Sequence, residues 1–170
     1  MGVSSVDEML GRATKSKRGY TQGFFSPLNP RKYKGDRNQI VFRSSYEYAA
    51  FTFCDTEKAV ERWSSEEVII PYTCPVTGKS RRYFMDLWIQ VKQPSGSVQE
   101  FLVEVKPKSQ TMEPVKGRGK NAEKRYQEAV VEYLTNQAKW EAARRWCDKK
   151  GMRFLLWTED EIFPGKRTWK

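Results

Sequence analysis

Two short stretches of the sequence place charged side chains inside otherwise apolar runs. Asp86 is the single acid among the apolar and aromatic residues 83–89, and Glu104 and Lys106 alternate with two valines just before a proline. Residues two apart on a strand point to the same face, so Glu104 and Lys106 are expected to project together. Phosphodiester hydrolysis with a hard cation requires clustered oxygen ligands and a nearby positive charge. Asp86, Glu104 and Lys106 are therefore candidates for such a site.

The pair formed by Glu104 and Lys106 has a simpler explanation as well. A Glu and a Lys that alternate on one face are also typical of a solvated strand edge, and a short E-x-K motif is weak evidence for catalysis. Asp86 strengthens the catalytic interpretation, because a turn at residues 94–97 separates the two strands. Adjacent antiparallel strands would then bring the two carboxylates together.

Glu47 is the fourth candidate, and two roles remain open for it. Ser44 and Glu47 have the spacing of a capping box, which stabilises a helix start by about 1 kcal/mol. A glutamate in the first turn of a helix also lies near the edge of a neighbouring sheet. Glu47 is therefore either a helix cap or a metal ligand, and the two roles are compatible.

The hydrophobic pattern predicts an α/β domain that would position these residues. The sequence indicates a helix, three meandering strands, a long helix and a final strand, which together form an α/β sandwich around a mixed sheet flanked by helices. A basic arm is expected over residues 1–40 and the folded domain over residues 41–170. The expected elements are a helix at 44–55, a short helical stretch at 57–63, strands at 68–73, 82–91 and 101–106, a helix at 122–150, a strand at 152–157 and a last helical turn near 158–163.

The charge balance predicts a polyanionic partner. The chain carries 31 Lys and Arg against 21 Asp and Glu, a net charge of +10. Basic residues gather in the arm, near the turn at 76–79, and directly after the candidate site over residues 105–125. The partner is either a nucleic acid or an anionic surface, and if it is DNA, contacts to the backbone rather than to bases are expected there. The candidates are Lys79, Arg81, Lys108, Lys116, Arg118, Lys120, Lys124 and Arg125.

Several classes of protein are excluded by composition. The chain has no histidine, which removes histidine-based catalysis and histidine-containing metal sites. Its three cysteines are far apart, so neither a zinc site nor a disulfide framework is expected, and the thiols are predicted to be reduced. No apolar run reaches transmembrane length, so an intracellular protein without a membrane partner is expected.

Seven motifs in order resemble a known family. The chain is similar to the head-completion proteins of tailed bacteriophages, which resemble the amino-terminal domain of the transposon-end endonuclease in the PD-(D/E)xK superfamily. The similarity covers about residues 24–163. The motifs are FSPLNPRKYKGD at 25–36, FRSSYE at 42–47, WSSEE at 63–67, IPY at 70–72, RYFMD at 82–86, VEVKP at 103–107 and NQAKW at 136–140.

The resemblance implies that residues 41–170 form a nuclease-like domain with a restriction-endonuclease-like mixed sheet flanked by helices. It also implies roles for the candidate residues. Asp86 and Glu104 would hold Mg²⁺ or Mn²⁺, Lys106 would lie beside the attacking water, and Glu47 would complete the site. The implied substrate is double-stranded DNA, and the implied partners are portal, neck or capsid proteins. The implied location is the host cytoplasm during assembly, or the head–tail neck of the virion. The alternative is a structural completion factor with a vestigial site.

The role of Gln137 also remains open. It falls on the apolar stripe expected for the long helix, where an amide needs a hydrogen-bonding partner. It is either a core amide or a residue behind the metal. Other branches of the superfamily place a glutamine from this helix beside the metal, but the Q-x-x-x-Y pattern that marks it is absent here, because Glu141 stands four residues later.

Overall fold

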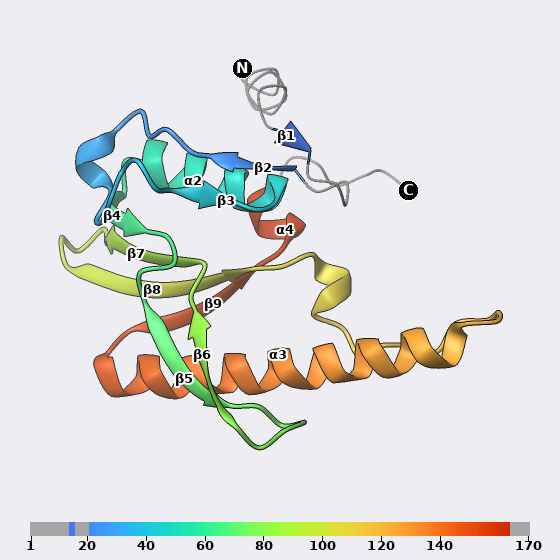
Figure 1. The fold of residues 1–170 in the computed structure, drawn as a ribbon. Helices are drawn as coiled ribbons and strands as arrows, with labels where there is room; N and C mark the ends of the chain where they lie inside the picture. Colours follow the sequence, from blue (N-terminus) through green and yellow to red (C-terminus); the bar gives the residue numbers. More distant parts are fainter. Residues whose placement is uncertain (1–13, 16–20, 164–170) are drawn as a thin grey trace.

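A computed structural model describes residues 14–15 and 21–163 of the chain. Short strands come first and lead into a helix, five strands, a long helix and a final strand (Figure 1). The elements are β1 (Thr14–Lys15), β2 (Thr21–Phe24), η1 (Pro30–Lys32), β3 (Val41–Phe42), α2 (Ser45–Thr56), β4 (Val60–Ser64), β5 (Ile69–Thr73), β6 (Ser80–Phe84), β7 (Leu87–Lys92), β8 (Val98–Val105), η2 (Lys108–Gln110), α3 (Ala122–Lys150), β9 (Arg153–Trp157) and α4 (Glu159–Ile162).

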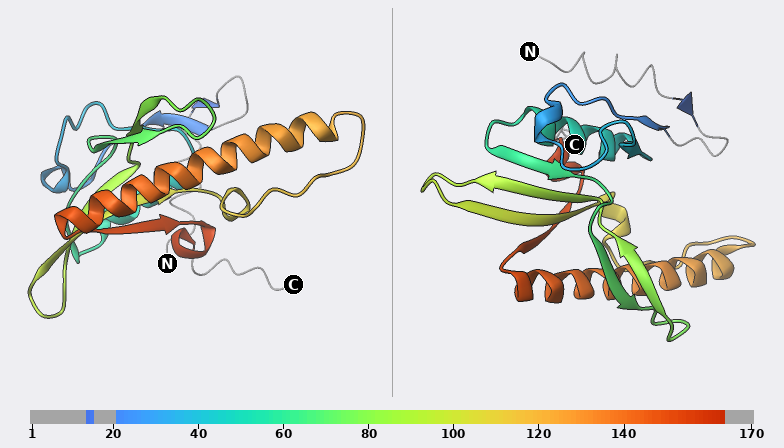
Figure 2. Two further views of the ribbon diagram at one scale, coloured as in Figure 1. Left: turned by 90° about the horizontal axis from the view of Figure 1, so that it is seen from below. Right: turned by 60° about the vertical axis from the view of Figure 1, so that its left-hand side comes forward.

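The central sheet has four strands in the order β4-β7-β8-β9. β7 pairs antiparallel with both β4 and β8, whereas β9 runs parallel to β8, so the sheet is mixed as expected. Helix α2 covers one face and helix α3 covers the other (Figures 1 and 2). This arrangement confirms the prediction of a mixed α/β fold with helices on both sides.

Strand alternation separates the core into two layers. On β8, Val103 and Val105 belong to the layer under α2, whereas Leu102 belongs to the layer under α3. Trp63 lies at the centre of the first layer and Trp140 of the second, and both are almost completely buried. Glu104 lies between the two valines in sequence and therefore points away from them, as the sequence predicted, which is the α3 side of the sheet.

Two expected elements are wrong. Residues 57–63 were expected to be helical, but β4 occupies most of this stretch, because Val60 and Trp63 are buried in the sheet by tertiary contacts that override local propensity. The single strand expected at 82–91 is two strands. β6 pairs only with β5, in a separate hairpin that crosses α3, and the chain turns into β7 at Met85 and Asp86 (Figure 1).

The long helix α3 has the predicted bounds, and Gly151 ends it with a φ of 66°. A left-handed residue of this kind is typical of a helix C-terminus. Trp140 and Cys147 on its stripe are buried, and the stripe faces β5, β8 and β9. All three cysteines of the chain are free and buried.

Part of the expected basic arm belongs to the core. Phe25, Tyr33 and Ile40 are buried in the α2 layer, and the Phe25 and Tyr33 rings make edge contacts with Trp63. Asp55, at the end of α2, holds this segment in place. Its Oδ2 accepts the backbone N–H of Leu28 at 2.7 Å, and its two oxygens accept that of Asn29 at 3.2 Å.

Replacement of Asp55 by alanine is expected to destabilise the protein by about 2–4 kcal/mol, because two backbone N–H groups lose their acceptor at a buried position. Urea unfolding followed by circular dichroism measures this loss. Asp36→Ala is the matched control, since Asp36 accepts one exposed backbone N–H from Asn38, and its loss should cost less than about 1 kcal/mol. Equal losses in both variants would show that Asp55 does not anchor the segment.

Candidate active site

Asp86 and Glu104 lie side by side at one end of the sheet. The register of β7 and β8 pairs Leu87 with Val103, and Asp86 directly precedes Leu87, so it comes next to Glu104. Asp86 Oδ2 accepts the backbone N–H of Val105 at 2.8 Å. Asp86 lies in the bend directly before β7. The two carboxylates thus come together at the adjoining ends of β7 and β8, as the sequence predicted.

Glu104 is a buried carboxylate that contacts a hydroxyl group and an ammonium group. Glu104 is only 3% exposed. The hydroxyl of Tyr83 donates to Oε2 at 2.6 Å, and Lys106 Nζ lies 3.4 Å from Oε1. The alternative of a solvated strand edge is therefore wrong for Glu104, because a solvated edge would leave this carboxylate in water.

The pKa of Asp86 is raised well above the ordinary value of an aspartate. Burial is the main cause, and the negative charges of Glu104 and Glu47 raise this pKa further. The N–H of Val105 and the ammonium of Lys106 act in the opposite direction. Three carboxylates that repel one another in this way are chemically suited to a bound cation, which would favour their charged forms.

Lys106 remains a cation in this surrounding. Burial by itself lowers the pKa of Lys106, but the carboxylates of Glu104 and Asp86 outweigh it, so that this pKa is raised overall. The backbone N–H of Lys106 donates to the carbonyl of Trp157 at 2.9 Å, which fixes the end of β8 against β9. Lys106 is therefore placed as a positive charge beside the acid pair.

Glu47 combines a capping position with a place at the site. Ser44 Oγ accepts the backbone N–H of Glu47, and Glu47 Oε2 accepts the backbone N–H of Arg43 at 2.8 Å, one residue before the position that a capping box uses. Burial is the largest cause of the raised pKa of Glu47, and the positive charge of Lys106 acts on this pKa in the opposite direction. Glu47 and Glu104 both interact electrostatically with Asp86, and we call these three carboxylates the acid cluster.

Two residues beside Glu47 were not predicted from the sequence. Arg43 Nη1 lies 2.5 Å from Glu66 Oε1, and Glu66 contributes to the raised pKa of Glu47. Glu66 has a positive φ of 57°, which is unusual for a residue with a side chain. A residue in this conformation next to an acid cluster is a signal that only the folded chain provides.

The donor set fits a cation that keeps most of its water. Among the residues described, no group of three or more Asp, Glu, Cys or His side chains is arranged to hold a metal ion. Mg²⁺ requires fewer, because it is often bound by one or two carboxylates together with waters and substrate phosphates. Asp86 and Glu104 supply such a pair of carboxylates.

The amide predicted on α3 is shifted by one residue. Gln137 is half-buried, whereas Asn136 is 5% exposed, and its Nδ2 has no hydrogen-bonding partner within the described part of the chain. One residue corresponds to about 100° around a helix, so the buried face passes through Asn136. Glu132, one turn earlier, contributes to the electrostatic surroundings of Lys106, which places this part of α3 near the site.

The predicted DNA-binding residues lie on two projections. Lys79 and Arg81 are exposed at the tip of the hairpin formed by β5 and β6, and the others follow β8 through the 107–121 loop into α3 (Figure 1). Three of them are ion-paired: Lys108 with Asp160, Lys116 with Glu123, and Lys124 with Glu128. Those that form no ion pair with any described residue are Lys79, Arg81, Arg118, Lys120 and Arg125.

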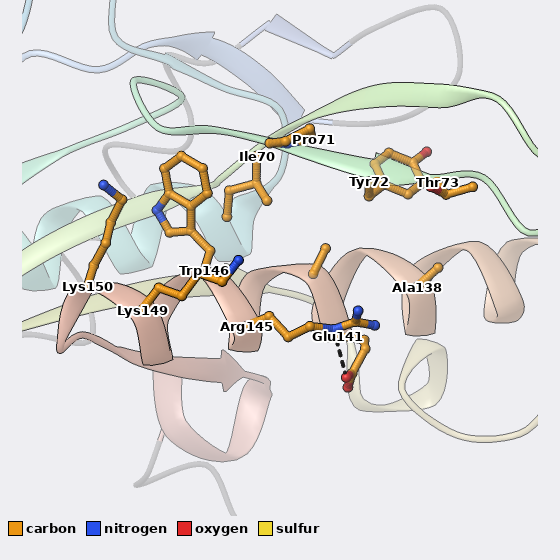
Figure 3. Close-up of a pocket in the computed structure, with 11 residues that line it drawn as sticks. Ile70, Pro71, Tyr72, Thr73, Ala138, Glu141, Arg145, Trp146, Lys149 and Lys150 are labelled. Carbon is orange, nitrogen blue, oxygen red and sulfur yellow. Dashed lines mark hydrogen bonds and ion pairs between the residues drawn. The ribbon is translucent and has the colours of Figure 1, made fainter.

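A separate groove of about 630 Å³ lies between β5 and the C-terminal half of α3 (Figure 3). Trp146, Lys149 and Lys150 line one end of it, and Arg145 and Glu141 form an ion pair along the helix. None of the four candidate catalytic residues lines this groove. It is therefore distinct from the acid cluster.

The fold and the acid cluster define the class of protein, and the comparisons agree. Residues 57–159 match the family described as "TnsA-like endonuclease N terminal", and the chain belongs to this family. Asp86, Glu104 and Lys106 lie inside the matched region, whereas Glu47 precedes it. The resemblance expected from the motifs is confirmed.

A particular relative narrows the assignment. The chain is 41% identical over 142 residues to the "Head completion nuclease" of Enterobacteria phage T4, and the match covers 82% of this chain and 92% of the relative. The chain is thus a homologue of a phage head completion nuclease. In the part of the chain that is described, no helix is long and apolar enough to cross a membrane.

Proposed function

We propose that this protein is a Mg²⁺- or Mn²⁺-dependent endonuclease that cleaves double-stranded DNA during completion of a phage head. The observation that carries the proposal is the juxtaposition of the buried Glu104 with the half-buried Asp86 and Lys106 at the end of the central sheet. Carboxylates withdrawn from water beside a lysine are a poor packing choice, because buried charges cost free energy unless they are paired or bind a metal.

Each residue has a distinct role in this proposal. Asp86 and Glu104 would hold the cation, and Glu47 would add negative charge on the α2 side. When bound, the cation would polarise the scissile phosphate and lower the pKa of a water molecule. Lys106 would orient the attacking water and stabilise the negative charge that develops on the phosphate.

The basic projections support DNA as the substrate. Lys106 is the first residue of a stretch, 106–125, that carries seven Lys and Arg against two Glu. Phosphates held along this stretch would lead directly to the site. The contacts expected are to the backbone, which makes binding strongly dependent on salt and weakly dependent on sequence.

The role in head completion rests on the T4 relative. That relative is named a head completion nuclease, and it shares most of its length with this chain. We infer that this protein acts in virion assembly, in the host cytoplasm or at the head–tail neck. Portal, neck or capsid proteins are its proposed partners.

Nicking of supercoiled plasmid tests the proposed activity. We expect nicked and then linear product with Mg²⁺ or Mn²⁺, and none with EDTA, because two carboxylates without a cation provide no means to activate water. Asp86→Asn, purified in the same way, is the control for contaminating nucleases. If the wild-type protein binds DNA but neither binds Mn²⁺ in calorimetry nor cleaves, the structural alternative with a vestigial site becomes the better one.

A further inference from the structure

The hydroxyl of Tyr83 donates a hydrogen bond to the carboxylate of Glu104. Tyr83 belongs to β6 of the separate hairpin, whereas Glu104 belongs to β8 of the central sheet. The two meet because the hairpin crosses α3 beside the end of the sheet (Figure 1). The bond from Oη to Glu104 Oε2 is 2.6 Å long, as expected for a charge-assisted hydrogen bond.

Packing alone does not require a hydroxyl at this position. Tyr83 is 4% exposed and lies in the apolar layer under α3. Phenylalanine would fill the same space, and a buried hydroxyl costs free energy unless it finds a partner. The group that distinguishes tyrosine from phenylalanine here contacts Glu104, one of the two proposed metal ligands.

The Tyr83 ring itself is held from two sides. The ring of Tyr72, on the neighbouring strand, makes an edge contact with it at 6.4 Å between centroids. Lys139 Nζ, from α3, lies 5.4 Å from the Tyr83 centroid and 5.8 Å from that of Tyr72. A ring fixed in this way directs its hydroxyl to one place.

The hydrogen bond selects between the two oxygens of Glu104. Oε2 is occupied by Tyr83, so that Oε1, which lies 3.4 Å from Lys106 Nζ, is the oxygen turned toward the cationic side of the cluster. A carboxylate without such a donor rotates more freely. Partners that orient a ligating group commonly contribute about 10–100-fold to metal affinity or activity.

We propose that Tyr83 is a positioning residue of this site, which orients the Glu104 carboxylate for a divalent cation by holding Oε2. This inference rests on the proposed function. Tyr83 itself does not contact the cation or the phosphate, and it acts through Glu104. The hairpin of β5 and β6 would thereby support the active site, although it pairs with no strand of the central sheet.

The test compares Tyr83→Phe with Tyr72→Phe, since each removes one hydroxyl from the same face of the same hairpin. We expect Tyr83→Phe to weaken Mn²⁺ binding in calorimetry about tenfold and to shift the Mn²⁺ dependence of nicking by a similar factor. Its affinity for DNA in EDTA should not change. Among the described residues it is Tyr83, and not Tyr72, whose hydroxyl donates to Glu104, so Tyr72→Phe should match the wild type in all three measurements.

The outcomes separate the two proposals. Unchanged Mn²⁺ affinity in a folded Tyr83→Phe protein, with normal binding by the wild type, would overturn the positioning role alone. If the wild type itself binds no Mn²⁺, both this role and the proposed activity fail. Equal losses of Mn²⁺ affinity in the two tyrosine variants would show that the hairpin acts only by packing, and a thermal melt of each metal-free variant checks that it is folded.

Discussion

Replacement of Lys106 by alanine is expected to reduce cleavage by at least about a hundredfold while DNA binding persists. Lys106 Nζ lies 3.4 Å from Glu104 Oε1 and is only partly exposed, so it is placed at the acid pair rather than on the basic surface. Loss of a charge that stabilises the transition state lowers the rate steeply. Single-turnover cleavage and a filter-binding titration at several salt concentrations measure the two quantities.

The expected effect on binding is small for a simple reason. The stretch that follows Lys106 contains six further lysines and arginines, and removal of one phosphate contact changes the salt slope by only about one. Lys106→Met keeps the aliphatic stem of the side chain, and it should lose cleavage to the same extent as the alanine variant. This second variant separates loss of charge from loss of packing.

Lys108→Ala is the matched control for Lys106. Lys108 follows the alternation of β8 beyond Pro107, but its side chain is 57% exposed and pairs with Asp160 at 2.7 Å on α4. It should keep activity and lose little affinity. If both variants lose binding and cleavage in parallel, Lys106 is one more residue that contacts phosphates. If neither variant changes in binding or in cleavage, Lys106 does not belong to the active site.

The helices were predictable because their ends carry local signals. The hydroxyl of Ser44 accepts an N–H at the start of α2, and Gly151 takes the left-handed conformation that ends α3. The stretch 57–63 has no such signal. Its strand β4 exists because Val60 and Trp63 are buried against β7, which is a tertiary effect that no local pattern contains.

The site was predictable to the extent that it lies at the adjoining ends of consecutive strands. Asp86 directly precedes β7, Glu104 lies on β8 and Lys106 directly follows β8, and the structure brings the three together as expected. Tyr83 and Glu66 could not be predicted in this way. Tyr83 reaches Glu104 only because the chain breaks at Met85 and sends β6 across α3, and the positive φ of Glu66 is a property of the folded backbone.

Asp86→Asn is expected to abolish cleavage and at the same time to stabilise the metal-free protein. Burial and the neighbouring carboxylates of Glu104 and Glu47 raise the pKa of Asp86 in the folded chain. The ionised form of this group therefore costs the folded protein free energy relative to the unfolded chain. Asparagine is neutral and retains an oxygen that can accept the N–H of Val105, so it removes the cost and keeps the hydrogen bond.

The sign of the pH dependence follows from the direction of the shift. A carboxylate whose pKa is higher in the folded state than in the unfolded state binds protons more readily when folded, so its contribution to stability improves as the pH falls through the raised value. The stability advantage of Asp86→Asn should therefore be largest near pH 8 and shrink toward pH 5. An effect on the order of 1 kcal/mol corresponds to a Tm increase of about 2–4 °C for a chain of this size.

Thermal melts at both pH values, with EDTA and with Mn²⁺, measure this prediction. Mn²⁺ should stabilise the wild type and leave Asp86→Asn unchanged, because binding to the folded state alone raises stability. Glu113→Gln removes one negative charge from an exposed loop position and should alter neither Tm nor the response to Mn²⁺. If Asp86→Asn instead melts lower than the wild type in EDTA at pH 8, Asp86 holds β8 in place as a structural acceptor. In that case, repulsion among the carboxylates of the acid cluster does not destabilise the metal-free protein, and a cation has no such repulsion to relieve.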